Sequence, residues 1–122
     1  MPREEFYLRD IVAAADAIGD FIAGLTVDVF VGVDVVRSAV MYKLIVIGEA
    51  AASLPESFRA THPQVPWADV AAFRNKAVHH YFGTDWRTVW EVAVRDVPSL
   101  RALVADILAA EFPSAPNSSG SG

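Results

Sequence analysis

The residues with the clearest chemical potential are an arginine and a histidine five positions apart, in the segment 73–82 (FRNKAVHHYF). A histidine titrates near neutral pH and can act as an acid or a base. An arginine keeps its positive charge and presents a planar fork of donors that matches the oxygens of a phosphate group. Arg74 and His79 are therefore candidates for acid–base chemistry beside a bound phosphate.

A helix through this segment would place the polar side chains on different faces. At about 100° per residue, Tyr81 lies about 20° from Arg74, and Asn75 lies one turn before His79. Arg74 and His79 are separated by about 140°, so the long arginine side chain or a second copy of the chain must bring them together. His80 falls on the far side, which favours His79 as the functional histidine.

The charge of the chain is distributed unevenly. Residues 59–87 include four basic and two acidic residues, whereas the remainder has six basic and thirteen acidic ones. The segment therefore carries +2 within a chain of net charge −5, and it also holds all three histidines. The overall acidity argues against a broad, non-specific nucleic-acid surface.

The composition excludes several kinds of site. The chain has no cysteine, which removes disulfides, thiolate zinc sites and cysteine nucleophiles. The histidines lack carboxylates at the usual ligand spacing, so we expect no metal and no cofactor. We find no signal sequence and no uninterrupted apolar run of the roughly 18 residues that a membrane span needs. A cytoplasmic location without membrane contact is expected.

The first half of the chain has helical periodicity. Apolar residues recur every three or four positions over residues 4–25, which predicts a helix. The valines of residues 27–35 alternate, which is typical of a strand, yet helical spacing then continues without a proline to residue 54. We therefore expect one long helix over residues 28–54, with Thr26 as a possible cap. Its largely apolar surface indicates packing against a second copy as well as within its own bundle.

Prolines and glycines mark the next boundaries. Pro55 ends the long helix, and residues 58–66 form a connection that contains two further prolines. A helix is then predicted over residues 67–82, stopped by Gly83.

The last part of the chain continues the helical pattern. Thr84 or Asp85 caps a helix from residue 86, in which Pro98 should cause a kink or start a fifth helix. The fold class is therefore all-α, an up-and-down bundle of four to five helices over residues 1–112. Residues 113–122 are rich in Pro, Ser, Asn and Gly, as in a flexible tail or linker.

The spacing of Arg74, His79 and Tyr81 matches the Arg-x4-His-x-Tyr motif, and in this motif the chain resembles the HepT-like proteins of the HEPN superfamily. The similarity extends over residues 3–112 and includes Ile47-Gly48-Glu49-Ala50-Ala51, Pro66-Trp67, Val89-Trp90 and Asp96-Val97-Pro98-Ser99-Leu100. One departure is Phe73, where the family pattern has Met or an aliphatic residue. This difference concerns packing beneath the site more than its chemistry.

The resemblance implies both a fold and a function. HEPN proteins are helical bundles that commonly dimerise, so that two motifs share one cleft, and many are ribonucleases that need no metal. HepT proteins are toxins paired with a minimal nucleotidyltransferase antitoxin, which adds AMP to the motif tyrosine. The resemblance implies that Arg74 and His79 are catalytic, that Asn75 supports them and that Tyr81 is modified. The implied partners are an RNA substrate, a second copy of the chain and the antitoxin.

Structural interpretations of the motif residues stay open. His79 could simply interact with the dipole at the end of its helix, and Tyr81 could lie at the edge of the core. Arg74 could be a structural partner of Asp69 or Glu49. The tryptophans are expected to pack in the core or at an interface.

Two other functions also stay open. One is a non-catalytic HEPN binding module that partners a minimal nucleotidyltransferase, which the acidic composition and the apolar long helix favour. The other is a purely structural dimer.

Overall fold

The computed structural model describes residues 2–79 and 85–113, apart from the side chains of residues 75–79. Over these residues the chain is helical and has no β-strand, which confirms the all-α prediction. The elements in chain order are α1 (Arg3–Ile22), α2 (Val27–Gly32), α3 (Asp34–Ser53), α4 (Glu56–Ala60), α5 (Trp67–His79), α6 (Trp86–Glu91), the π-helical turn η1 (Val92–Asp96) and α7 (Val97–Glu111).

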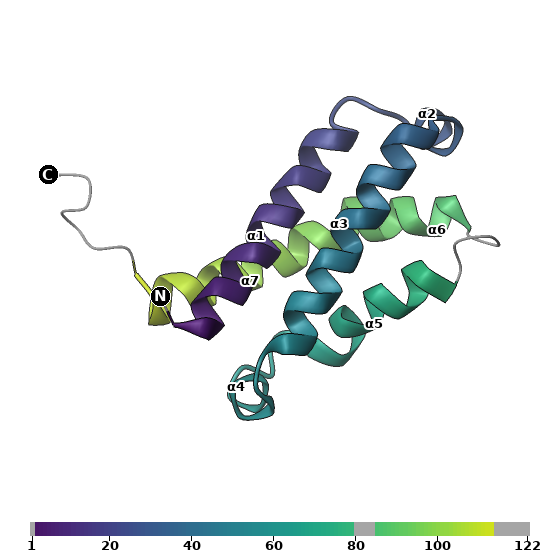
Figure 1. The fold of residues 1–122 in the computed structure, drawn as a ribbon. Helices are drawn as coiled ribbons and strands as arrows, with labels where there is room; N and C mark the ends of the chain where they lie inside the picture. The colour runs from purple at the N-terminus through teal and green to yellow at the C-terminus, as the bar shows by residue number, and fades with distance from the viewer. Residues whose placement is uncertain (1, 80–84, 114–122) are drawn as a thin grey trace, which may run out of the picture.

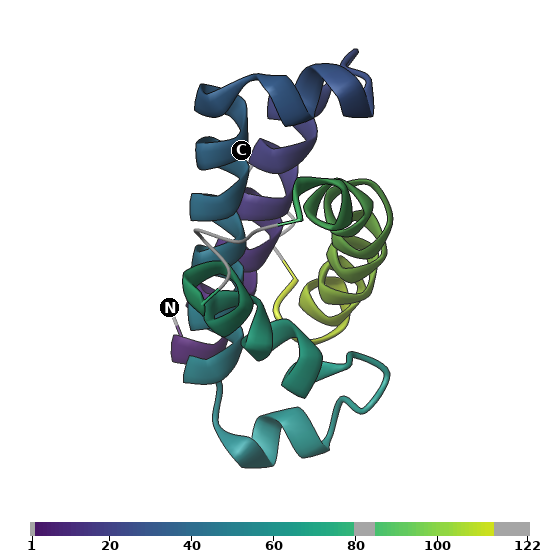
Figure 2. The same cartoon turned by 90° about the vertical axis from the view of Figure 1, so that its right-hand side faces the viewer.

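Helix α3 is the centre of the packing, because it contacts both α1 and α5. The helices α1 and α3 run side by side, and α5 lies along the part of α3 that leads into α4 (Figure 1). The elements α6, η1 and α7 follow one another along one side of this layer, where α7 packs on α1 (Figure 2). The core is apolar and draws on α1, α3 and α7, with Leu8, Ile11, Ile47 and Val104 fully buried.

The single long helix expected over residues 28–54 is wrong, because the chain breaks between α2 and α3. Val33 has an extended backbone with φ −112° and ψ 103°. Gly32 and the β-branched Val33 both have weak helix propensity, so the break costs little helical stability. Nη1 of Arg37 donates to the carbonyl oxygen of Val31 at 2.7 Å, which satisfies a carbonyl group that the break leaves without a helical partner.

The break lets α2 turn toward α6. Phe30 is fully buried, and its ring centroid lies 6.4 Å from that of Trp86 and 5.3 Å from that of Trp90. The guanidinium of Arg37 lies 5.0 Å from the centre of the Trp86 ring, a cation–π contact. The alternating valines of this region therefore lie in α2, at the break and in α3, and both tryptophans pack in the bundle as expected.

The other early boundaries agree with the sequence to within a turn. The predicted first helix is confirmed as α1, which ends at Ile22, and Gly24 turns the chain with a positive φ of 77°. Thr26 caps α2, since its Oγ1 accepts from the backbone N–H of Val29 at 3.2 Å. The connection expected over residues 58–66 includes the end of the short helix α4. The predicted stop at Gly83 lies outside the described residues.

The helix break expected at Pro98 takes the form of a π-helical turn. Asp85 caps α6 by accepting from the backbone N–H groups of Arg87 and Thr88 at 3.1 and 3.4 Å. Hydrogen bonds from the side chain and backbone of Thr88 hold the pKa of the Asp85 carboxyl below its usual value. Pro98 lies in the first turn of α7, and the π-helical turn directly before it accommodates a proline ring that cannot donate to a preceding carbonyl.

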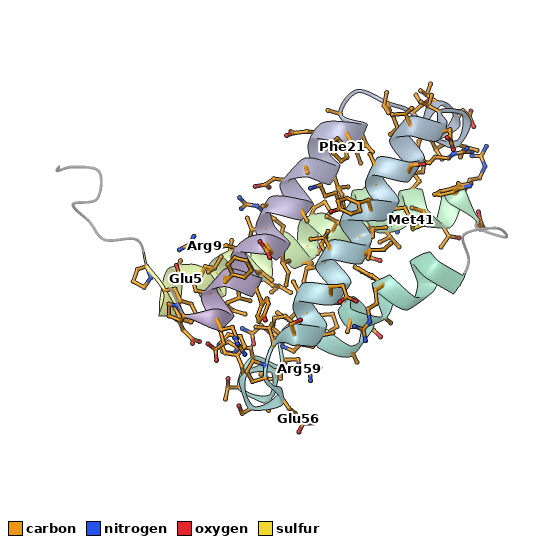
Figure 3. The ribbon with its side chains drawn as sticks, viewed as in Figure 1. Glu5, Arg9, Phe21, Met41, Glu56 and Arg59 are labelled. Atoms are coloured by element: carbon orange, nitrogen blue, oxygen red, sulfur yellow. The ribbon has the colours of Figure 1, made fainter. Side chains whose placement is uncertain are left out.

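The side chain of Arg9 links the first half of α1 to the residue that follows α7. Arg9 pairs with Glu5 on α1 (Figure 3). Arg9 also donates to the backbone carbonyl oxygen of Phe112, the residue after α7, at 3.3 Å. None of the helices in the described ranges combines the length and the apolar character required to span a bilayer.

His62 links the α4–α5 connection to α7. Its side chain is buried, with Nδ1 2.9 Å from the carbonyl oxygen of Phe58 and Nε2 hydrogen-bonded to the carboxylate of Glu111. Both groups are acceptors, so the geometry favours an imidazole that is protonated on both nitrogens. Burial opposes this charge, but the Phe58 carbonyl and the Glu111 carboxylate outweigh burial and raise the pKa of His62 above its usual value. The backbone carbonyl of His62 also accepts from Nε1 of Trp67 at 2.9 Å, at the start of α5.

The raised pKa of His62 predicts a pH-dependent stability. The charged form contributes its full stability below the ordinary histidine pKa of about 6.5, and this contribution is lost as the pH rises through the raised pKa. Chemical denaturation from about pH 6 to about pH 9 should show a fall in unfolding free energy that is smaller in Glu111→Gln, which keeps a hydrogen-bonding group without the charge. An identical fall in both proteins would contradict this assignment.

Candidate functional site

Arg74 lies where the backbone of α5 closely approaches α3, opposite Gly48. A Cβ atom added at Gly48 would lie 2.7 Å from the backbone nitrogen of Arg74 and 3.2 Å from the carbonyl oxygen of Ala71. Separations below 3.0 Å essentially never occur for real Cβ atoms, so any side chain at this position would push the two helices apart. A glycine inside a helix costs about 1 kcal/mol relative to alanine, and the close approach explains why this one is present.

The guanidinium of Arg74 pairs with Glu49, the residue that follows this contact on α3. Nη1 donates to Oε1 at 3.0 Å, and the side chains of Arg74 and Glu49 are 40% and 59% exposed. Of the two partners that the sequence left open, Glu49 and Asp69, the structure therefore selects Glu49. An exposed pair of this kind contributes only about 0–1 kcal/mol to stability. Its contribution to stability is therefore a weak reason for its presence.

Among the described residues, Arg74 uses only part of its hydrogen-bonding capacity. A guanidinium carries five N–H donors, and within the described part of the chain only Nη1 has an acceptor. The side chain is also partly exposed, so a phosphate group from solvent can reach it. The arginine therefore has the charge, the donors and the access that phosphate binding requires.

The remaining motif residues are placed only in part. Helix α5 continues through His79, so the backbone from Arg74 to His79 is helical as expected. The side chains of Asn75 and His79, and all of Tyr81, lie outside the described residues, and their positions stay predictions. Five residues of helix correspond to a rise of about 7.5 Å and a rotation of about 140°, which is the separation that the two catalytic candidates must bridge.

The basic excess of residues 59–87 is reduced in three dimensions by acidic residues from elsewhere in the chain. Besides the pair of Arg74 with Glu49, Nη2 of Arg87 lies 2.7 Å from Oδ1 of Asp28 on α2. Both carboxylates come from helices that precede the basic segment. Any anionic ligand must therefore be held by a few directed contacts with the arginines rather than by a wide positive surface.

Both flanks of residues 80–84 are anchored to the α2–α3 region. On the N-terminal side, α5 packs against α3 at Gly48. On the C-terminal side, the contacts of Trp86 with Phe30 and Arg37, and the pair of Arg87 with Asp28, hold the start of α6. Sequence reasoning did not find these anchors, because each joins residues far apart in the chain. The only local sequence feature that pointed to one of these contacts was Gly48, a glycine inside the predicted long helix.

Other potential sites lie elsewhere or are absent from the described residues. Over 2–79 and 85–113, no cluster of three or more His, Asp or Glu side chains is arranged to hold a metal ion. A surface depression of about 560 Å³ lies between α1 and the η1–α7 region and is lined by residues that include Asp16 and Arg101 but not Arg74.

Comparison with known proteins identifies the family. The family model described as Ribonuclease HepT-like matches residues 11–107, a range that includes Gly48, Glu49 and the whole motif. The chain belongs to this HepT-like family. Membership supports a ribonuclease function for the HepT-like chain and agrees with its helical bundle.

Several relatives of the HepT-like chain carry ribonuclease names. A Caldanaerobacter subterraneus subsp. tengcongensis protein named "Putative RNase" is 35% identical over 86% of this chain and 94% of its own length. A Thermococcus cleftensis protein named "Probable ribonuclease HepT" is 37% identical over 78% of this chain and 86% of its own. A Methanocaldococcus jannaschii protein named "Putative RNase" is 39% identical over 81% and 84% of the two chains. No solved structure matches the chain significantly.

The close approach at Gly48 predicts a specific stability effect. Gly48→Ala should destabilise the HepT-like chain by about 1–3 kcal/mol, because the added methyl group meets backbone atoms that cannot rotate away. Gly19→Ala on α1 is the matched control, since nothing lies within 4 Å of its added Cβ and alanine favours helix there. Thermal unfolding measures both variants. Equal midpoints for them would show that the α3–α5 contact tolerates a side chain.

Proposed function

We propose that the HepT-like chain is a metal-independent endoribonuclease and the toxin of a toxin–antitoxin pair. Arg74 and His79 are its catalytic residues, and Asn75 supports them. The observation that carries the proposal is the partly exposed guanidinium of Arg74 on the motif helix of a chain that belongs to a ribonuclease family. Only Nη1 of this guanidinium has an acceptor among the described residues. RNA is the substrate.

The proposed reaction uses the chemistry of the two side chains. The imidazole of His79 takes the proton from a ribose 2′-hydroxyl, and the 2′-oxygen attacks the adjacent phosphorus. Arg74 stabilises the extra negative charge of the five-coordinate phosphorane with its charge and its donors. The bond from phosphorus to the 5′-oxygen breaks, an imidazolium protonates that oxygen, and the products end in a 2′,3′-cyclic phosphate and a 5′-hydroxyl. Asn75, one turn before His79, orients the imidazole or donates to the phosphate.

A homodimer is part of the proposal, and the exposed face of α3 supports it. Val35 and Tyr42 are 76% and 61% exposed, which is unusual for large apolar side chains. They share one face of α3 with Glu49, since the three lie at intervals of seven residues. A second copy packed along this face would bury both side chains and bring a second motif toward Arg74.

The proposed regulation follows from the position of Tyr81 in the motif. The cognate antitoxin is a minimal nucleotidyltransferase that transfers AMP to the tyrosine hydroxyl. The sequence predicts that Tyr81 lies two helical turns from Arg74, so the negative charge of the added phosphodiester competes with RNA phosphate for the guanidinium and repels the RNA backbone. A cytoplasmic location suits a toxin that acts on RNA.

The second candidate function is a non-catalytic module that holds the nucleotidyltransferase. The pairing of Arg74 with Glu49 and the net charge of −5 favour it, because both lower the affinity for RNA. Co-purification with the transferase, together with no RNA cleavage and no growth arrest, would select this function.

The ribonuclease proposal predicts cleavage in the presence of EDTA. His79→Ala should lower the rate by about 10²–10⁴-fold, which is the usual contribution of an acid–base group. His80→Ala is the matched control and should retain activity, because the sequence predicts that His80 lies on another helix face. Gel analysis should detect products ending in a cyclic phosphate. Full activity in His79→Ala at unchanged thermal stability would remove this residue from the mechanism.

The regulatory proposal predicts the modification of one tyrosine. Coexpression with the cognate transferase should increase the mass of the wild-type chain by whole AMP units, as measured by intact-mass spectrometry. Tyr81→Phe should abolish the addition, because it lacks the accepting hydroxyl, whereas Tyr42→Phe should be modified like the wild type. An unmodified wild-type chain under these conditions would contradict the antitoxin mechanism.

A further inference from the structure

The side chain of Glu49 binds only one of the guanidinium nitrogens of Arg74. Its Oε1 accepts from Nη1, and within the described part of the chain Arg74 is the only hydrogen-bond partner of its carboxylate. Ser53 bonds to the backbone carbonyl of Glu49 and not to its side chain. The carboxylate therefore has one identified task in the described structure, which is to fix the position of the guanidinium.

Another ion pair between helices shows how different this geometry is. Arg101 on α7 binds Asp16 on α1 through two nitrogens, with Nε 3.0 Å from Oδ1 and Nη2 3.4 Å from Oδ2. That arrangement occupies the fork of the guanidinium, and it has an exposure similar to that of the pair between Arg74 and Glu49. In Arg74, by contrast, Nε and Nη2 have no acceptor among the described residues, so the edge that bears them can still receive two phosphate oxygens.

The close contact between Gly48 and the backbone of Arg74 brings the side chains of Glu49 and Arg74 within hydrogen-bonding distance. Gly48 brings the backbone of α5 to α3 at Arg74 itself, and the next residue on α3 supplies the carboxylate. The glycine fixes where the Arg74 side chain begins, and the carboxylate fixes where it ends. An arginine that is free to rotate would lose about 2 kcal/mol of rotamer entropy on binding phosphate, and a tethered one has already lost part of it.

We infer that Glu49 is a positioning residue for Arg74, which holds the guanidinium by Nη1 so that its remaining donors meet the scissile phosphate. This inference rests on the ribonuclease function proposed above. The hydrogen bond of Glu49 orients the arginine, whereas its negative charge opposes the approach of RNA. The two effects can be separated, because glutamine keeps an oxygen acceptor of the same reach and lacks the charge.

The test compares kcat and KM for RNA cleavage in Glu49→Ala, Glu49→Gln and Asp16→Ala. Glu49→Ala should lower kcat about tenfold, since misplacing a reacting group by about 1 Å can cost up to 10²-fold. Glu49→Gln should restore kcat to within about threefold of wild type, with an equal or lower KM, because the oriented guanidinium remains. Asp16→Ala removes an ion pair of similar exposure away from the site and should leave both constants unchanged.

A double-mutant cycle tests whether Glu49 affects kcat through Arg74. In an Arg74→Lys background, which lacks the fork, Glu49→Ala should lower kcat much less than tenfold. Three results would overturn the positioning role. The first is an equal loss of kcat in both backgrounds, and the second is a wild-type kcat in Glu49→Ala. The third is a loss of kcat that Glu49→Gln fails to restore and that parallels a lower thermal unfolding midpoint. In these cases the dependence on Arg74 and His79 still supports the ribonuclease. A wild-type chain without cleavage would overturn the proposed function and this inference with it.

Discussion

The close contact between α3 and α5 at Gly48 is the constraint on which the site depends. Two helices can approach to this distance only where one of them has no side chain, and here the opposing residue is Arg74. The contact fixes the height and rotation of α5 on α3 at Arg74. Because the contact is made by backbone atoms, flexible side chains cannot adjust to relieve it.

The irregular parts of the fold support this arrangement. The break at Val33 turns α2 so that Phe30 packs under Trp86, and this packing holds the start of α6. The π-helical turn before α7 lets the chain pass Pro98 without leaving the bundle. The described elements on either side of residues 80–84, α5 and α6, are therefore both held by contacts with the α2–α3 region.

Local sequence patterns predicted most helices correctly. They failed where contacts between residues far apart in the chain determine the structure. Apolar spacing correctly gave α1, the start of α5 and the helical region after residue 86, because burial of one face follows directly from periodicity. The break at Val33 was missed, since it is stabilised by Arg37 and by Phe30 packing on α6, which no local pattern reveals. The sequence limited the partner of Arg74 to two carboxylates, and only the packing of α5 on α3 selected Glu49.

The proposed mechanism requires that Arg74 and His79 act on the same phosphate. A crystal structure of the chain with an RNA that carries a 2′-O-methyl group at the cleavage position, and so cannot react, tests this most directly. The account predicts one phosphate whose oxygens accept from Nε and Nη2 of Arg74, with the imidazole of His79 beside the blocked 2′-oxygen. RNA bound away from α5, or a phosphate that contacts neither side chain, would contradict it.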